Sequence, residues 1–512
     1  MEKKNDKKDA DKDKKDADKD KKDGEDKDKK SEVKPINVEL EGITDRVVRL
    51  TPNSCDMGDA IISKDGETLY YLASFEGDMD LWKMDLRKHE TKLISKGAGS
   101  GAFTTDGEGK TIFLLGSKAM KKLDGDNLKA ITYSAQMKLD HAAEREYMFN
   151  YVYREEQKRF YTEDMHGVDW DAMTKAYRKF LPHISNNYDF AELLSEWLGE
   201  LNVSHTGGRY YPEKSAEGTA SLGLLYDLSY TGNGLKVAEV VKGGPFDHAN
   251  LKLKAGDIIT HINGTEITPE HDVSQLLMGQ SGKKTLVSIK GSDDAVVLPV
   301  TSSAMSDLLY DRWVKQRAAD VEKWSGGRLG YVHIRQMNDD SFRPIYSDIM
   351  GKYYECDGIV IDTRFNGGGR MHEDIEIMFS GQKYLTQVVR GRESCDMPSR
   401  RWNKPTIMLQ CEANYSNAHG TPWVYSHQKL GKLVGAPVPG TMTSVNWVTM
   451  QDPTLIFGIP VIGYRTAEGN YLEGTQLEPD IYVLNSPETV VQGEDSQLKA
   501  AVEELLREIG NK

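Results

Sequence analysis

The stretch DGIVIDTRFNGGGR, residues 357–370, decides the fold of the second half of this chain. Its continuous apolar run, Ile359 to Ile361, is typical of a strand that is buried on both faces. Three further apolar runs follow along the chain, at 405–410, 432–438 and 479–484. Strands of this kind, separated by loops and helix-like segments, predict an α/β core over residues 304–500 with a parallel or mixed sheet covered by helices.

The segment directly upstream, residues 217–303, resembles a PDZ domain. The resemblance rests on LGLL at 222–225, GGPFDHANL at 243–251 and AGDIITHING at 255–264. A PDZ domain holds the terminal carboxylate of a peptide on loop amides and adds the peptide as an extra strand. The resemblance therefore implies a substrate-binding loop at Leu222, Gly223 and Leu224. The alternative is a PDZ fold that serves only as a spacer.

Helical periodicity dominates residues 136–216. In DFAELLSEWLGEL, residues 189–201, six apolar side chains share one face of a helix: Phe190, Leu193, Leu194, Trp197, Leu198 and Leu201. Asp189 followed by Glu192 resembles a capping box at the start of that helix. The pattern predicts a small helical domain, and Ser204 and His205 lie just after its last helix.

Residues 36–135 carry short strand-like runs at 67–74, 79–86, 91–97 and 110–117, with Asp-Gly turns between them. They predict antiparallel meanders, which correspond to one or two blades of a β-propeller. So few blades make a poor unit by themselves, which favours further sequence upstream. Together with the helical, PDZ and α/β segments, they give a multidomain α+β chain.

The two ends of the chain carry little signal for folding. Residues 1–35 are almost entirely Lys, Asp and Glu, so they predict a disordered linker. A calcium loop is the alternative there, but Lys22 and Asp23 stand where an EF-hand needs an oxygen ligand and a glycine. Residues 501–512 are expected to form a C-terminal tail.

Composition narrows the class of protein. The 512 residues carry a net charge of −14, which argues against nucleic acid as a partner. No apolar run is long enough to predict a membrane span, and the N-terminus has no signal-peptide core. The four cysteines are scattered and no HExxH motif occurs, so we expect no disulfide framework, no metal site and no cofactor.

Ser416 is the first candidate catalytic residue. It lies on the turn between the strand ending at Gln410 and the next helix, where α/β enzymes collect reactive groups. The alternative is that it caps the helix. Gly367 to Gly369 follow the neighbouring strand, and their accessible amides are suited to an oxyanion hole; a simple turn or a phosphate cradle are the alternatives.

Taken together, these motifs resemble the tricorn protease family, within the tail-specific protease superfamily. Five features occur in the family's order: SH at 204–205 after a helix, the inserted PDZ domain, DTRFNGGG at 362–369, NYSNAHG at 414–420 and YLEGTQLEPD at 471–480. VELEGITDRVVRLT at 38–51 also resembles the family's propeller region. The likeness covers roughly residues 36–490.

The resemblance implies a role for each matching residue. Ser416 becomes the nucleophile and His205 the general base, while Ser204 and Glu473 orient the imidazole. The amides of Asn417 and of Gly367 or Gly368 form the oxyanion hole. Thr441 stands where Ser/Lys relatives carry their lysine, which favours a Ser/His mechanism. His419 and His372 are alternative bases on proximity alone.

These roles predict a serine peptidase that cleaves peptides or unfolded chains. The alternatives are an inactive PDZ scaffold, a propeller-linked interaction protein and a Ser/Lys C-terminal processing peptidase. Family resemblance implies a homo-oligomer, hexameric in the family, and a cytoplasmic location, with export as the alternative if a signal peptide lies upstream. Three acids near the site are candidates for a pocket that binds a basic substrate side chain: Glu393, Asp396 and Glu412.

Overall fold

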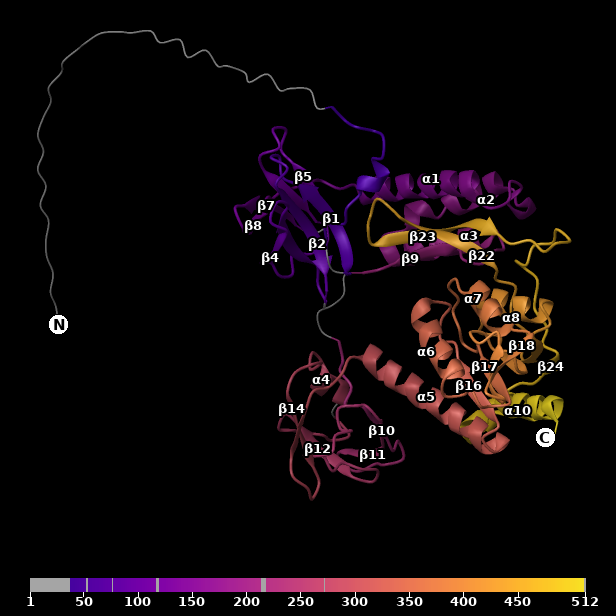
Figure 1. Ribbon diagram of the computed structural model, residues 1–512. Helices are drawn as coiled ribbons and strands as arrows, with labels where there is room; N and C mark the ends of the chain where they lie inside the picture. Colours follow the sequence, from indigo (N-terminus) through magenta and orange to yellow (C-terminus); the bar gives the residue numbers. More distant parts are fainter. Residues whose placement is uncertain are drawn as a thin grey trace, which may run out of the picture. The chain divides into compact units, whose positions relative to one another are not determined.

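The computed structural model describes residues 37–51, 54–75, 77–116, 119–212, 218–270 and 272–510 (Figure 1). The linker expected at residues 1–35 lies outside this described part of the chain. The chain forms two compact units, and the boundary between them lies between Met137 and Lys138.

The first unit consists of two four-stranded antiparallel sheets. One contains β1 (Asp56–Ile62), β2 (Thr68–Ser74), β3 (Asp80–Asp85) and β4 (Glu90–Ser95). The other contains β5 (Ala102–Thr105), β6 (Ile112–Leu115), β7 (Met120–Asp124) and β8 (Asn127–Ile131). Leu72 and Leu81 of the first sheet share an apolar core with Leu114 of the second. The meanders predicted from the sequence are therefore two partial propeller blades.

The second unit begins with three helices: α1 (His141–Arg159), α2 (Trp170–Arg178) and α3 (Asn187–Gly199). All six apolar residues predicted for one face of α3 are buried. The expected capping box is wrong, because the side chain of Asn186 accepts the hydrogen bond from the amide of Asp189. The helix therefore begins two residues earlier than the sequence pattern indicated, with an asparagine cap.

A three-stranded sheet packs against these helices, and its strands come from distant parts of the chain (Figure 1). β9 (Gly207–Tyr210) follows α3, whereas β22 (Thr443–Thr449) and β23 (Leu455–Gly463) come from the segment expected to belong to the α/β core. A Cβ atom on Gly208 would lie 2.8 Å from Cβ of Leu194, so only glycine permits β9 to lie this close to α3.

The PDZ segment forms a small sheet with its own core. The strands are β10 (Leu224–Tyr226), β11 (Leu235–Val240), β12 (Ile258–Ile262), β13 (Thr265–Glu266), β14 (Thr285–Ile289) and β15 (Ala295–Val297), and α4 (Val273–Leu277) packs beside them. β10 is an edge strand of this sheet. An edge strand is what a peptide needs if it is to bind as an additional strand.

The α/β half contains a parallel five-stranded sheet in the order β16-β17-β20-β21-β24. These strands are β16 (Leu329–His333), β17 (Gly358–Asp362), β20 (Thr406–Gln410), β21 (Gly431–Gly435) and β24 (Ile481–Tyr482). Ile359 and Ile361 of β17 enter one apolar core, and Val360 between them enters the other. The sequence prediction of a strand buried on both faces is confirmed.

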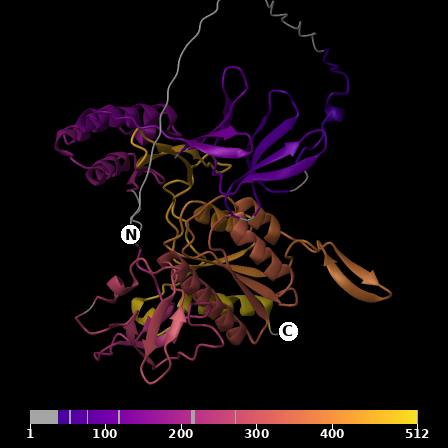
Figure 2. The same ribbon diagram turned by 90° about the vertical axis from the view of Figure 1, so that its left-hand side faces the viewer.

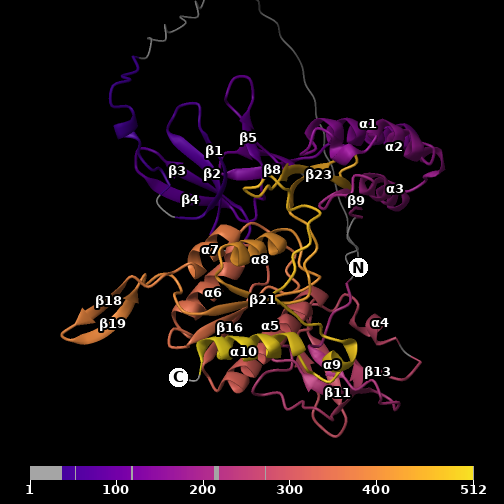
Figure 3. The same ribbon diagram turned by 90° about the vertical axis from the view of Figure 1, so that its right-hand side faces the viewer.

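Helices cover both faces of this sheet (Figure 3). On one face lie α6 (Asp339–Met350), α7 (His372–Phe379) and α8 (Asn417–His427), and on the other lie α5 (Ser302–Ser325) and α10 (Ser496–Ile509). A short helix, α9 (Pro487–Val491), precedes α10. The expectation of a C-terminal tail at 501–512 is wrong, because α10 extends to Ile509. Its residues Ala501, Val502 and Leu505 are buried against the sheet.

One hairpin, β18 (Leu385–Val389) and β19 (Arg392–Met397), projects from the body of the sheet (Figure 2). It carries two of the acids that were candidates for binding a basic substrate side chain. Asp396 pairs with Lys383 at 2.7 Å and accepts a hydrogen bond from Thr386. Within this chain its charge is therefore already neutralised by a neighbouring lysine.

Candidate active site

Ser416 lies at a strained turn at the carboxyl end of the sheet. Its backbone has φ 59° and ψ −126°, and it immediately precedes α8. Its side chain makes no capping hydrogen bond to the helix, so the alternative of an ordinary N-cap serine is not supported. Strained serines at strand-to-helix turns are typical of nucleophiles, because the turn presents the hydroxyl away from the backbone.

The glycine loop after β17 lies directly against this serine. A Cβ atom on Gly368 would stand 2.5 Å from Cβ of Ser416 and 3.0 Å from its Oγ. The amide of Tyr415 donates to the carbonyl of Asn366 at 3.0 Å, which joins the two loops. Gly368 has φ +97°, so both its conformation and its neighbour require glycine.

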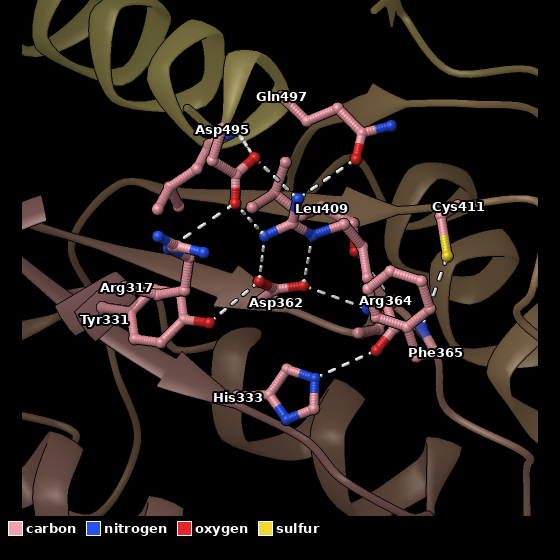
Figure 4. Close-up of polar contacts among 12 residues, drawn as sticks. Arg317, Tyr331, His333, Asp362, Arg364, Phe365, Leu409, Cys411, Asp495 and Gln497 are labelled. Atoms are coloured by element: carbon pink, nitrogen blue, oxygen red, sulfur yellow. Dashed lines mark hydrogen bonds and ion pairs between the residues drawn. The ribbon is translucent and has the colours of Figure 1, made fainter. Parts of the chain in front are cut away.

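A buried ion network fixes the base of that loop (Figure 4). The Arg364 guanidinium, 1% exposed, pairs with Asp362 at 2.7 Å and with Asp495 at 2.8 Å. The phenol of Tyr331 donates to Asp362, and a ring nitrogen of His333 lies 2.9 Å from the carbonyl oxygen of Arg364. Every charge in this network has a partner, which is what makes burial tolerable.

Ser204 and His205 follow α3 and meet Glu473 there. His205 Nδ1 lies 2.7 Å from Ser204 Oγ. That hydroxyl donates to Glu473 Oε2 at 2.9 Å, and the Ser204 amide donates to Oε1 at 2.6 Å. An ionised carboxylate only accepts, so the Ser204 proton is committed to Glu473 and Ser204 Oγ accepts from Nδ1–H. This arrangement leaves the lone pair on Nε2 of His205.

Burial shifts the pKa of both His205 and Glu473 in the direction that favours the neutral form. Burial, and secondarily the charge of Arg209, lower the pKa of His205 to about 4. Burial raises the pKa of Glu473, and the hydrogen bonds from Ser204 oppose that rise. His205 is therefore a neutral imidazole near neutral pH, which is the form that a general base requires.

Tyr415 brings His205 to the nucleophile's turn. Its phenol oxygen accepts a hydrogen bond from the His205 amide at 2.7 Å, and the two rings lie 4.6 Å apart. In the described residues no hydrogen bond joins His205 to Ser416 directly. Tyr415 immediately precedes Ser416, so this contact brings the turn of His205 close to the turn of Ser416, although 210 positions separate His205 from Tyr415.

The two alternative bases make different contacts. His372 Nδ1 lies 2.7 Å from the side-chain nitrogen of Asn417. His419, on α8, is 1% exposed and neither of its ring nitrogens has a hydrogen-bond partner in the described part of the chain. Burial lowers the pKa of His419 to about 4. The backbone amide of His419 donates to the carbonyl of Ser416 at 2.8 Å, but among the described residues no hydrogen bond connects the ring of either histidine to Ser416.

Several groups around the expected oxyanion hole already have hydrogen-bond partners within the chain. The Gly368 amide donates to the side chain of Asn366 at 2.8 Å. The Ser416 amide donates to Thr441 Oγ1 at 2.9 Å. The side-chain oxygen of Asn417 accepts from the amides of Met371 and His372, which holds the first turn of α8 against α7. Gly367 lies between Asn366 and Gly368, which are hydrogen-bonded to each other.

Leu222 and Leu224 of the PDZ loop direct their side chains into the PDZ core, where both are buried. Gly223 has φ +70°, and its carbonyl accepts from Val241. Any peptide at this loop must therefore meet its backbone rather than its leucine side chains. Glu412, the third candidate acid, lines a cavity of about 710 Å³ together with Trp313, Arg364 and Phe365.

Sequence reasoning missed the roles of Tyr415 and Thr443. Thr443 Oγ1 lies 3.1 Å from both Ser204 Oγ and His205 Nδ1. Nothing in the spacing of either residue indicated such contacts, because each joins segments that lie more than 200 residues apart in the sequence. In the described residues, no group of three His, Cys, Asp or Glu side chains is placed to hold a metal, and no helix is long and apolar enough to cross a membrane.

Comparison with known proteins agrees with this domain order. Residues 328–483 match peptidase family S41, residues 141–199 match the tricorn protease C1 domain, and residues 236–291 match a PDZ domain. Tricorn protease homolog 1 of Streptomyces coelicolor is 25% identical over 507 residues, covering 91% of this chain and 47% of that protein. The tricorn protease homolog of Saccharolobus solfataricus is 22% identical, covering 92% and 46%.

The crystal structure of the tricorn protease superposes with a TM-score of 0.76 at 17% sequence identity, covering 87% of this chain and 46% of that one. The chain thus spans about half the length of the curated relatives it matches. Its fold and matched domains are similar to those of serine proteases with an S41 peptidase domain. Within that class, the chain is similar to the tricorn proteases over most of its length.

Proposed function

We propose that this chain hydrolyses peptide bonds with Ser416 as nucleophile, His205 as general base, and Ser204 and Glu473 as the groups that orient His205. The observation that carries the proposal is the hydrogen-bonded series from Glu473 through Ser204 to His205 Nδ1, which lies beside the strained turn of Ser416. A serine hydroxyl needs a base held in one tautomer, and this series supplies one.

In the proposed reaction, Ser416 Oγ attacks the carbonyl carbon of the scissile bond while His205 Nε2 takes the hydroxyl proton. The carbonyl oxygen becomes an oxyanion, for which the Asn417 amide and the glycine-loop amides are the donors. Gly367 is the better glycine, because the Gly368 amide already donates to Asn366. His205 then protonates the leaving amine as the peptide bond breaks. In the second half, His205 takes a proton from water, the water oxygen attacks the acyl carbon, and the proton passes to Ser416 Oγ as its bond to the acyl group breaks.

The absence of a direct hydrogen bond between His205 and Ser416 is compatible with this reaction, because catalytic hydrogen bonds commonly tighten only when substrate binds. Thr441 is the side chain that stands where Ser/Lys relatives carry a lysine, and its hydroxyl already accepts from the Ser416 amide. This contact favours a Ser/His mechanism over a Ser/Lys mechanism.

Substrate, assembly and location are further parts of the proposal. Peptides or unfolded chains are the substrates, and the PDZ loop at Leu222, Gly223 and Leu224 holds their carboxyl ends through its backbone. We also infer a homo-oligomer and a cytoplasmic location from the family resemblance. Size-exclusion chromatography with light scattering tests the first, and fractionation of the native host tests the second.

A fluorophosphonate probe tests the central activity, because it labels only a serine that a base has activated. We expect labelling of the full chain to be abolished by Ser416→Ala and strongly reduced by His205→Ala. Ser426→Ala, on the same helix α8, is the matched control and should label normally. A wild-type chain that is folded but unlabelled would instead support an inactive PDZ scaffold.

A further inference from the structure

One short turn contacts both of the residues that react in the proposed mechanism, Ser416 through its backbone amide and His205 through its ring. The threonine turn, residues 440–443, leads into β22. Its Thr441 Oγ1 accepts from the Ser416 amide at 2.9 Å. Its Thr443 Oγ1 lies 3.1 Å from His205 Nδ1 and 3.1 Å from Ser204 Oγ. Thr443 is only 2% exposed, so these contacts form away from bulk water.

The threonine turn is also anchored to the segment that carries Glu473. The amide of Gly474 donates to the carbonyl of Gly440 at 2.9 Å. A Cβ atom on Gly440 would lie 2.2 Å from the nitrogen of Thr475, so the two backbones are in close contact there. The turn therefore moves together with Glu473, and its two hydroxyls keep a fixed spacing between the nucleophile's amide and the imidazole.

The available hydroxyl and ring protons indicate that Thr443 accepts a hydrogen bond from His205. The Ser204 hydroxyl proton is committed to Glu473, so His205 Nδ1–H is shared between two acceptors, Ser204 Oγ and Thr443 Oγ1. The Thr443 proton is then free to point at the carbonyl of Ser204, 3.4 Å away. Two acceptors, one on the turn after α3 and one at the start of β22, restrict rotation of the imidazole more than one acceptor does.

We propose that Thr443 is a positioning residue that, with Ser204, fixes the tautomer and ring orientation of His205, while Thr441 registers the nucleophile's backbone against the same turn. This inference rests on the proposed function of Ser416 and His205. A base held in this way presents Nε2 to one place only, and misplacement by about 1 Å costs on the order of 10²-fold in rate.

The test compares three variants of the full chain. Thr443→Val removes the hydroxyl at almost constant volume, Thr443→Ser keeps the hydroxyl, and Thr449→Val makes the same change at the far end of β22. The readouts are kcat and KM on an unstructured peptide and the rate at which a fluorophosphonate labels Ser416. We expect Thr443→Val to lower kcat and the labelling rate by about 10- to 100-fold with little change in KM.

Thr443→Ser should recover labelling to within a few-fold of wild type, and Thr449→Val should behave as wild type. The proposal is overturned if Thr443→Val labels as fast as Thr449→Val, or if serine is as poor as valine at 443, since the methyl group would then be what matters. If the valine variant loses its cooperative thermal transition, Thr443→Ala takes its place with the same expected loss.

The outcome for Thr443 can be separated from the outcome for the proposed function. Ser416→Ala serves as the reference in the same assays. Undiminished hydrolysis by that variant contradicts the proposed function itself. An inactive Ser416→Ala beside a fully active Thr443→Val contradicts only the positioning role of Thr443.

Discussion

The phenol oxygen of Tyr415 accepts a hydrogen bond from the backbone amide of His205 at 2.7 Å. This contact joins the helical layer, which carries the histidine, to the α/β sheet, which carries the serine. It also places the aromatic ring of Tyr415 against the imidazole, 4.6 Å away. Tyr415, the residue before Ser416, therefore helps to set the position of His205.

Tyr415→Phe tests that contact, because it removes the acceptor and keeps the ring. We expect kcat/KM to fall about 2- to 10-fold, as for loss of one hydrogen bond of ordinary strength. Tyr188→Phe, on α3, is the control and should leave kcat/KM unchanged. Wild-type kinetics for Tyr415→Phe would mean that the phenol does not position His205.

The pH dependence of activity should follow His205. Its pKa is lowered to about 4, so its neutral form persists well below the pH at which an ordinary histidine becomes protonated. Arg209 contributes to this lowering, and removal of its positive charge should raise the pKa. Arg209→Gln is therefore expected to move the acid limb of kcat/KM to higher pH, whereas Arg209→Lys should not. A limb that stays in place or moves to lower pH in Arg209→Gln contradicts the assignment.

Glu156 should destabilise the chain at neutral pH. It is fully buried in α1, and neither of its carboxylate oxygens has a hydrogen-bond partner among the described residues. Burial raises its pKa well above the usual value, so the carboxyl in the folded chain holds its proton to higher pH than in the unfolded chain. Folding then becomes less favourable as pH rises from about 4.5, the ordinary pKa of a glutamate, through the raised pKa.

Glu156→Met removes this group and should raise the free energy of unfolding by about 1 to 3 kcal/mol at pH 8, with a smaller gain at pH 4. Urea denaturation at both pH values measures the difference. Glu192→Met, an exposed position on α3, is the control. A gain that does not depend on pH would show that packing, rather than ionisation, is responsible.

The ion network beneath the glycine loop predicts a large loss of stability. Arg364→Met would leave Asp362 and Asp495 buried without their shared cation. We expect the free energy of unfolding to fall by about 3 to 5 kcal/mol, as when one partner of a buried pair is removed. Arg343→Met, an exposed pair on α6, should change it by less than about 1 kcal/mol. Equal effects at the two positions would contradict a structural role for the network.

Periodicity and strand patterns were sufficient to predict much of this fold. The apolar face of α3 and the strand Ile359–Ile361 depend on local sequence, and both are confirmed. The pairing of β23 with β9 could not be predicted, because it joins segments about 250 residues apart and leaves no local signal. For the same reason the contacts of Thr443, the first residue of β22, with Ser204 and His205 were not predicted, although Thr441 in the same turn was aligned with the lysine of the Ser/Lys relatives.

The roles of the candidate site residues come from the family resemblance, and they stay predictions. Local chemistry alone left Ser416 as an N-cap or a nucleophile, and the missing capping bond argues against the first alternative, whereas the nucleophile stays a prediction. The C-terminal helix α10 was not predicted, because most of its residues were assigned to a tail at 501–512. Its apolar face covers the sheet.

A double-mutant comparison of Ser416 and His205 tests the central claim most directly. Ser416→Ala and His205→Ala should each lower kcat by about 10³-fold or more, and the double variant should be hardly worse than either single variant, because two groups that share one proton transfer are non-additive. Ser204→Ala and Glu473→Gln should be milder. Effects of Ser416→Ala and His205→Ala that multiply in the double variant would contradict the account, and the base would then have to be sought at His419 or His372.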